Sequence, residues 1–142
     1  MLLGDYQHTL DDKGRVVMPS AFRPELEDGC VVTKGPEGQL LVYPTDGFRQ
    51  FAEELRAEGG DRKHAKMSRL LFSGADEQKL DRQGRVLLKQ ELRKYADLVD
   101  VSEIAVIGNM ERAEVWNLAR WQQERDALDE AYRSEQEEVA GM

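Results

Sequence analysis

The chain has 142 residues, of which 40% are hydrophobic and 34% are charged, and its formal net charge is −8. This length fits one ordinary domain or two very small ones, and the apolar content argues against a disordered chain. No segment approaches the ~18 consecutive apolar residues of a membrane span, and the N-terminal apolar run is too short for a secretory signal, so we expect a cytoplasmic protein without membrane contact.

The first half of the chain predicts two hairpins around a short helix. Residues 6–18 predict a strand, a tight turn and a second strand, with Gly14 supplying the positive φ of the turn. Pro19 ends this hairpin, and Ser20 is the expected N-cap of a short helix that runs through Leu26. Residues 30–34 and 40–43 flank a Gly-Pro-Glu-Gly segment, which predicts a second hairpin.

The second half repeats this order. The pattern Leu-Asp-x-x-Gly-Arg-Val at residues 10–16 returns at residues 80–86. We expect a first hairpin over 79–88, a short helix over 91–98, and a second hairpin of 104–107 with 114–116 that turns at Gly108-Asn109. A half of about 70 residues is close to the size at which a single core becomes marginal. The two halves should therefore pack together or against other copies of the chain.

Longer helices follow each half. Residues 48–55 place apolar side chains at i, i+3, i+4 and i+7, and a basic helix over 62–72 leads into the second half. Residues 118–132 show looser helical spacing, and the polar residues 134–142 are expected to fray. The segment 117–142 contains seven acidic and three basic side chains, so much of the negative charge lies in the tail.

The sequence contains no recognisable catalytic or metal-binding motif. Two histidines, His8 and His64, and the single cysteine Cys30 form no clustered ligand set, and no phosphate-binding glycine pattern is present. Ser20 and His8 lack a third group that would orient them as nucleophile and base. We therefore expect no enzyme activity, no metal and no cofactor.

Each repeated turn carries an arginine that turn geometry does not require. A hairpin turn explains the aspartate and the glycine, because Asp bonds turn amides and Gly takes the left-handed position. An Asp four residues before an Arg can hold the guanidinium in one rotamer, as bidentate contact with guanine or phosphate requires. The alternative is an ion pair that only fastens the hairpin, and one pair can do both. The candidate DNA-binding residues are Lys13, Arg15, Arg82 and Arg85, and the candidate supporting residues are Asp11, Gly14, Asp81 and Gly84.

In combination these motifs resemble the MraZ family of bacterial transcriptional regulators. Residues 1–15 are similar to the family's opening and residues 71–85 to its second repeat, with shorter matches at 32–35, 43–44, 92–96 and 106–108. The resemblance runs from Met1 to about Trp121 and leaves only the acidic tail outside it.

The resemblance implies an α+β fold of two tandem swapped-hairpin, SpoVT/AbrB-like β-barrel modules that form a pseudo-dimer with flanking helices. On this basis residues 1–47 are the first module and residues 74–117 the second. Residues 48–73 are connecting helices, and residues 118–142 are an acidic C-terminal helix.

The resemblance also implies a function. It predicts a nucleoid-associated, homo-oligomeric ring, typically an octamer, that binds short direct repeats in double-stranded DNA. These repeats are expected upstream of the cell-division and cell-wall gene cluster, including the protein's own gene. It ties the Asp-x-x-x-Arg of each module to the DNA-binding face, whereas Lys13 and Arg82 are added from local charge. Lys89 stands where proline is expected, which leaves equal use of the two modules open and predicts a looser strand-to-helix turn there.

The alternative is an antitoxin-like protein-interaction module that acts through the acidic C-terminal helix. Apolar side chains in that helix, Leu118, Trp121, Leu128 and Tyr132, instead favour packing within the protein's own assembly.

Overall fold

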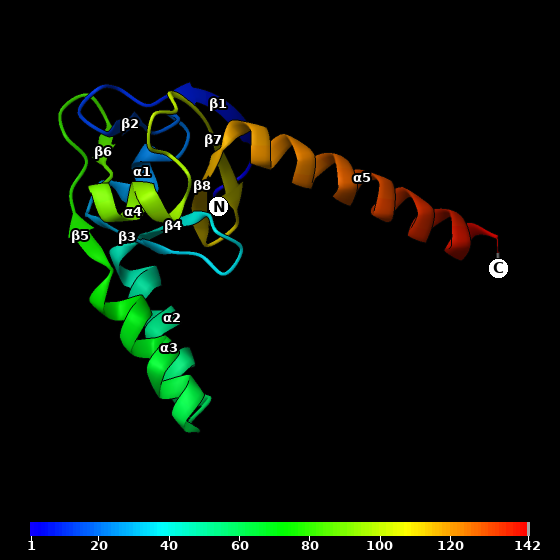
Figure 1. The fold of residues 1–142 in the computed structure, drawn as a ribbon, viewed down its shortest axis with the longest axis horizontal. Helices are drawn as coiled ribbons and strands as arrows, with labels where there is room; N and C mark the ends of the chain where they lie inside the picture. The colour runs from blue at the N-terminus through cyan, green and yellow to red at the C-terminus, as the bar shows by residue number, and fades with distance from the viewer. Residues whose placement is uncertain (142) are drawn as a thin grey trace.

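A computed structural model describes residues 1–141 as a mixed α+β fold (Figure 1). The strands are β1 (Asp5–Thr9), β2 (Arg15–Val17), β3 (Cys30–Lys34), β4 (Leu40–Pro44), β5 (Asp76–Gln78), β6 (Arg85–Leu87), β7 (Glu103–Asn109) and β8 (Arg112–Asn117). The helices are α1 (Arg23–Leu26), α2 (Thr45–Ala57), α3 (Arg62–Ser73), α4 (Gln90–Tyr95) and α5 (Leu118–Ala140).

Strand pairing crosses between the two halves of the chain. Six antiparallel strands lie in the order β1-β7-β8-β4-β3-β5, and β2 pairs with β6 in a separate two-stranded ribbon. Thus β1 of the first half pairs with β7 of the second, and β5 of the second half pairs with β3 of the first. The mixed helices and strands confirm the predicted α+β fold class, and the exchange is compatible with the predicted AbrB-like modules, although not with closed β-barrels. Over residues 1–141 the strands form an open sheet and no closed barrel.

The strands that flank each turn do not form the local hairpins predicted for residues 6–18 and 79–88. Asp11 N donates to Arg15 O at 3.0 Å and Leu10 bridges to Val16, but β1 and β2 then separate to different partners. A turn fixes only its own geometry, whereas burial of apolar faces distant in sequence decides the strand partners. The local-hairpin prediction is therefore wrong beyond the turns.

The β2–β6 ribbon lies where the two halves meet. Val16 pairs with Val86, its own counterpart in the repeat, so an approximate twofold axis passes through this pair. Because side chains alternate along a strand, both valines face inward and are fully buried. Arg15 and Arg85 lie on the opposite face of the same ribbon. The ribbon therefore closes the core with one face and leaves the arginine face outward.

Both halves contribute to one hydrophobic core. Its fully buried members include Leu2, Met18, Leu26, Val32, Val42, Val86, Leu88 and Ile104. Cys30 is buried among them, and burial, with a smaller effect of Asp76, raises the pKa of its thiol to about 11. Gly108 admits the N-terminal segment, because a Cβ there would overlap the Leu2 backbone. The main core is therefore shared by the two halves, and a smaller cluster of Ala105, Ile107 and Trp116 lies within the second half.

Two local predictions are wrong. Ser20 does not cap α1, which begins at Arg23 after a turn in which Phe22 N donates to Pro19 O at 2.9 Å. The β7–β8 hairpin turns at Met110-Glu111, two residues beyond Gly108-Asn109, and Met110 has a φ of 62°. A non-glycine residue with positive φ gives little sequence signal, and Gly108 serves close packing instead.

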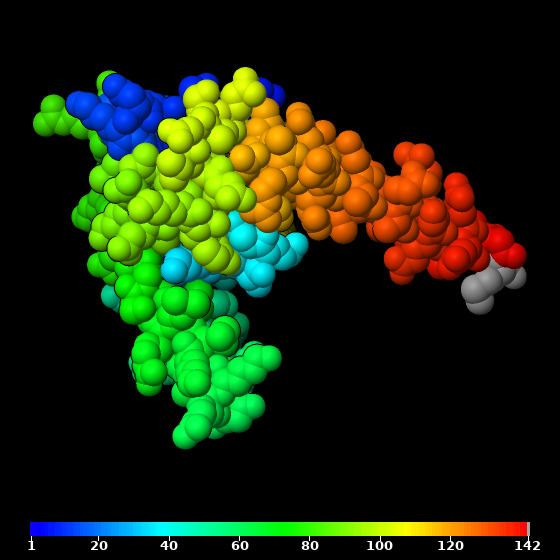
Figure 2. Space-filling view, viewed as in Figure 1, coloured from blue at the N-terminus to red at the C-terminus, as the bar shows by residue number. Residues whose placement is uncertain are grey.

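The helices α2 and α3 form one arm and α5 forms another, and the two arms project from the sheet in different directions (Figures 1 and 2). The α2–α3 break falls at residues 58–61, with Asp61 capping α3 through His64 N at 2.8 Å. The helix α5 continues to Ala140, so the fraying predicted for residues 134–142 is not found up to residue 141, and Met142 lies outside the described residues. Among residues 1–141, no helix combines the length and the apolar composition that crossing a membrane requires.

Candidate nucleic-acid interface

The first repeated turn fixes its arginine through the side chain of Asp11. Asp11 Oδ1 accepts from the backbone N of Lys13 at 2.9 Å and of Arg15 at 2.8 Å, and Oδ2 accepts from Arg15 Nε at 2.7 Å. Gly14 N donates to Asp11 O at 3.0 Å, and Gly14 has a φ of +80° that a side chain would strain. One carboxylate therefore shapes the turn and orients the guanidinium.

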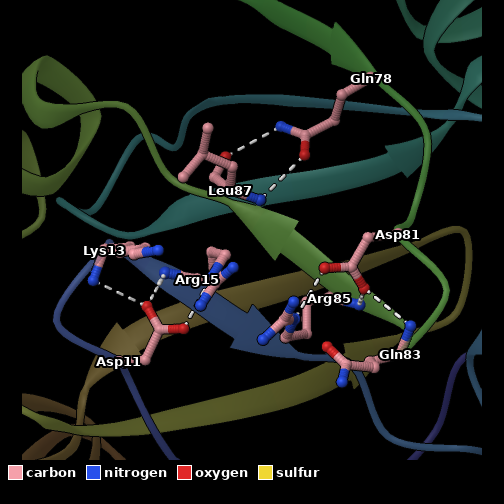
Figure 3. A network of polar contacts seen from close by, with 8 residues as sticks. All are labelled: Asp11, Lys13, Arg15, Gln78, Asp81, Gln83, Arg85 and Leu87. Carbon is pink, nitrogen blue, oxygen red and sulfur yellow. Dashed lines mark hydrogen bonds and ion pairs between the residues drawn. The ribbon is translucent and has the colours of Figure 1, made fainter.

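The second turn repeats this geometry (Figure 3). Asp81 Oδ1 accepts from the backbone N of Gln83 and of Arg85, both at 2.9 Å, and Oδ2 accepts from Arg85 Nε at 2.7 Å. Gly84 has a φ of +75° and donates to Asp81 O at 2.9 Å. The two Asp–Arg pairs lie side by side on the outer face of the ribbon, one from each half of the chain.

Both carboxylates are held in the ionised form. Hydrogen bonds from the backbone N of Arg15 and Arg85 are the largest cause that lowers the pKa of Asp11 and Asp81, and they act against desolvation, which raises it. The arginine side chains keep 29% and 23% of their surface exposed. Only Nε of each is bonded within residues 1–141, so the terminal nitrogens are free to meet an external acceptor.

Each turn is also packed by an arginine from the other half. Arg93 lies against Gly14, and its Nε donates to Leu88 O at 3.0 Å. Arg23 lies against Gly84, and its Nε donates to Met18 O at 3.1 Å. These two arginines were not predicted as site residues from the sequence, although their equivalent places in the repeat are a signal that could have identified them.

Backbone hydrogen bonds also link the two halves at the turns. Met18 N donates to Gly84 O at 2.9 Å and Leu88 N donates to Gly14 O at 2.8 Å. Each turn glycine thus accepts a hydrogen bond from the strand end of the opposite module. Neither turn is complete without the other half.

The second module adds a polar network that the first lacks. Gln78 pairs with the backbone of Leu87, donating from Nε2 to O and accepting at Oε1 from N, both at 2.9 Å (Figure 3). Gln78 Nε2 also donates to Asp76 Oδ2 at 2.8 Å, and Lys89 Nζ lies 3.0 Å from Asp76 Oδ1. Lys89 has a φ of −61°, the angle that proline imposes, so the predicted loosening at this position is not found.

The remaining candidates lie at the turns. Lys13 and Arg82 are exposed near the turn tips, beyond Arg15 and Arg85. Within the described chain, no three His, Cys, Asp or Glu side chains gather in a way that could hold a metal ion. The arrangement offers cationic hydrogen-bond donors on a narrow ribbon, which suits binding to a polyanion.

The crossed strands and the two carboxylate-fixed arginines define a two-module, swapped-hairpin protein of the AbrB-like class. A family model described as "MraZ protein, putative antitoxin-like" matches residues 1–69 and 71–140. The chain belongs to this MraZ family.

Several relatives carry the name "Transcriptional regulator MraZ". The chain is 44% identical to one from Finegoldia magna over 124 residues, which are 87% of this chain and 85% of the relative. It is 44% identical to one from Moorella thermoacetica over the same length and with the same coverage. It is 42% identical to one from Saccharopolyspora erythraea over 140 residues, which are 98% of this chain and 96% of the relative.

Proposed function

We propose that this chain is a sequence-specific, DNA-binding transcriptional regulator that reads DNA with the outer face of the β2–β6 ribbon. The observation that carries the proposal is the pair Arg15 and Arg85, each fixed by a carboxylate in the same geometry on that face. The relatives are named as transcriptional regulators, which supports the proposal and agrees with the expectation of no enzyme activity.

The ribbon has the dimensions and the donors that groove binding needs. A two-stranded ribbon fits the major groove, and a pre-oriented guanidinium can bind guanine O6 and N7 or a phosphate with two parallel hydrogen bonds. Arg15 and Arg85 are diagonal neighbours in the register, about 7–8 Å apart at the backbone. Lys13 and Arg82, farther out on the turns, are placed for phosphate contacts that set position without reading sequence.

The overall negative charge is compatible with this binding. Seven acidic side chains lie in residues 117–142, and α5 projects away from the ribbon (Figure 1). Exposed charges separated by more than about 10 Å are largely screened at moderate salt. The local charge of the turns therefore matters more than the net charge of the chain.

One ribbon makes few phosphate contacts and binds weakly by itself. We propose that copies of the chain assemble into a ring, an octamer in the form that the family resemblance implies, and that the ring engages several short direct repeats at once. Linked sites raise the effective concentration and hence the avidity. The proposed target is DNA upstream of the cell-division and cell-wall genes, including the protein's own gene, which places the protein at the nucleoid.

The proposed division of labour keeps residues 1–47 and 74–117 as the two DNA-binding modules. Residues 48–73 join them, and residues 118–142 form the acidic helix. The packing of Arg23 against Gly84 and of Arg93 against Gly14, each across the halves, supports treating the two modules as one binding unit.

A mobility-shift titration against the DNA upstream of the protein's own gene tests the proposal. Arg15→Ala combined with Arg85→Ala should weaken binding about 30-fold or more, since each arginine contact contributes about 1–3 kcal/mol. Arg49→Ala is the matched control, because Arg49 is an exposed residue of α2 far along the chain from both turns. Unchanged affinity in the double variant would contradict the proposal, as would a log–log salt slope near zero.

The second candidate function is protein interaction through α5, as in an antitoxin-like module. It is favoured by the exposure of residues 126–141 and by the words "putative antitoxin-like" in the family description. Deleting residues 123–142 separates the two functions. Loss of a bound partner protein with full retention of DNA binding would support this candidate, whereas loss of self-assembly would not.

A further inference from the structure

The outer part of α5 has an apolar stripe that has no packing partner among residues 1–141. The helix is tied to the body only near its start, where Trp121 Nε1 and Arg125 Nη1 donate to Asp5 Oδ2 at 2.9 and 3.1 Å. Farther out, Leu128 and Tyr132 are 54% and 66% exposed, and Val139 continues the same face. An isolated helix of about 15 residues is marginal in water, so this segment needs a surface to pack on.

A matching groove opens beside the other arm. It has a volume of about 530 Å³ and lies between the β3–β4 turn, α2, α3 and α4. Phe51 and Leu55 line it from α2, and Met67 and Leu70 line it from α3, the last two being 55% and 50% exposed. Half-exposed apolar side chains around a groove of this size indicate an interaction site.

The charges around the two surfaces are opposite. The groove's two charged lining residues, Lys34 and Arg112, are both basic, and α3 carries Arg62, Lys63, Lys66 and Arg69 with no acidic residue. Residues 126–140 of α5 carry six acidic side chains and one basic. The two helical segments are also alike in length, about 18 Å for α3 and about 22 Å for residues 126–140.

The two surfaces cannot meet within one chain as it is folded. The α2–α3 arm and α5 leave the body in different directions, and open space separates them in Figure 2. We propose that the outer half of α5 from one copy docks in the groove beside α3 of a second copy. Each copy then offers one helix and one groove, a head-to-tail contact that closes into a ring when the rotation allows. This inference rests on the proposed assembly and names the surfaces that form it.

Reversing the charges on each side tests the contact. The groove variant combines Lys63→Glu, Lys66→Glu and Arg69→Glu, and the helix variant combines Asp129→Lys, Glu135→Lys and Glu138→Lys. All six positions are exposed, so the fold should persist, and circular dichroism checks it. Sedimentation should show assembled wild type and a several-fold loss of mass for each variant alone, because each then brings like charges together.

Mixing the two variants should restore the wild-type mass. In a mixture the reversed groove meets the reversed helix, and the unaltered groove meets the unaltered helix, so both contacts are attractive again. A general loss of stability would not be rescued in this way. The control combines Glu27→Lys and Asp28→Lys, exposed residues on neither surface, and should assemble as wild type.

A variant of unchanged charge separates this inference from DNA binding. Leu128→Ser with Tyr132→Ser should also lose mass, yet it should bind a duplex with one repeat as wild type does and lose only the added affinity for several repeats. Wild-type mass in the charge variants, failure of the mixture, or a monomeric wild type would overturn the docking contact. A monomeric wild type that binds a different protein through α5 would assign the helix to that partner. Absence of DNA binding in every form contradicts the proposed function and leaves the mass result standing.

Discussion

Behind the first turn the supporting side chains are aromatic, whereas behind the second they are polar or charged. In the first half, Tyr6 packs edge-on against Phe22 with ring centroids 5.5 Å apart, and Pro19 follows the strand. In the second half, the Gln78 side chain makes two hydrogen bonds with the backbone of Leu87 in β6, and Lys89 forms an ion pair with Asp76 of β5. The inner Asp–Gly–Arg geometry is nevertheless the same.

The geometry that orients Arg15 and Arg85 is therefore set by the turn and by contacts across the halves, and it is the same whether the side chains behind the turn are aromatic or polar. The carboxylate, the left-handed glycine and the arginine from the opposite short helix occur in both copies. The side chains behind each turn can differ because their role is only to hold the end of the strand in position. We therefore expect Arg15 and Arg85 to contribute equally to DNA binding. The side chains behind the two turns should differ in how their contribution to stability depends on salt.

The largest effect is expected where the two repeats meet. Val16→Asp or Val86→Asp puts an unpartnered carboxylate at a fully buried site, and each should lower the free energy of unfolding by about 3–5 kcal/mol. Chemical denaturation followed by circular dichroism measures this loss. Leu87→Asp, on the exposed face of the same ribbon, is the control and should cost little. Clearly unequal losses at the two valines would break the symmetry inferred here.

The arginines provide the next comparison. Arg15→Ala and Arg85→Ala should each weaken DNA binding by about 5–150-fold, since each removes a contact of about 1–3 kcal/mol, and the two losses should be similar. Fluorescence anisotropy with a fixed duplex and fixed salt measures both. Arg→Lys at either site keeps the charge but loses the planar fork, so it should fall between wild type and alanine. A loss confined to one arginine would show that a single module reads the DNA.

The turn glycines should differ in their tolerance of a side chain. Alanine in the left-handed region costs about 1–2 kcal/mol at either site. At Gly14 the added Cβ would also lie 3.0 Å from Leu88 O, a main-chain atom, whereas at Gly84 it meets the Arg23 side chain, which can move. Thermal unfolding should therefore show a greater loss for Gly14→Ala than for Gly84→Ala. The reverse order would mean that the Arg23 contact is the more rigid one.

The supports should respond differently to salt. The Lys89–Asp76 pair is partly exposed and contributes at most about 1 kcal/mol, which salt reduces. Lys89→Pro fits the existing φ of −61°, so its gain of about 0.4–1 kcal/mol offsets the lost ion pair. Unfolding in low and high salt should show unchanged stability with a weaker salt dependence. If the stability of Lys89→Pro depended on salt as strongly as that of wild type, the Lys89–Asp76 pair would not be the source of the salt dependence.

The smallest difference is expected in the titration of the two carboxylates. The folded pKa of Asp11 and of Asp81 is lowered below 3.8, first through the backbone N of the arginine. The stability that each contributes is therefore complete above the unfolded pKa and is lost as the pH falls through the folded pKa. Carboxyl ¹³C shifts followed by NMR should give similar low values for both. In Arg15→Ala the Asp11 pKa should rise only in part, since the backbone donor remains.

The turns were predictable from the sequence because their chemistry is local. Asp11, Gly14 and Arg15 lie within five residues, and each has a role that its own geometry explains. The chain crossing was not predictable from turn geometry, since the same turn serves a local hairpin or an exchanged one. The family resemblance supplied that feature.

The supporting contacts were harder to predict for a different reason. Gln78 acts on Leu87 and Lys89 acts on Asp76 across loops whose path depends on the completed fold. A polar side chain can bond any neighbour that the fold brings near, so its type alone does not name a partner. Arg23 and Arg93 were the exception, because the repeat itself aligns them.

The pairing of Val16 with Val86 has a consequence for direction along DNA. Two identical chains related by a true twofold axis present the same face whichever way they lie on a duplex. Here the halves are covalently joined and unlike, with lysine at one strand end and proline at the other. The ribbon thus has two unlike ends. A protein with unlike ends can favour one orientation on a DNA repeat, so that copies bound to successive direct repeats all point the same way along the duplex.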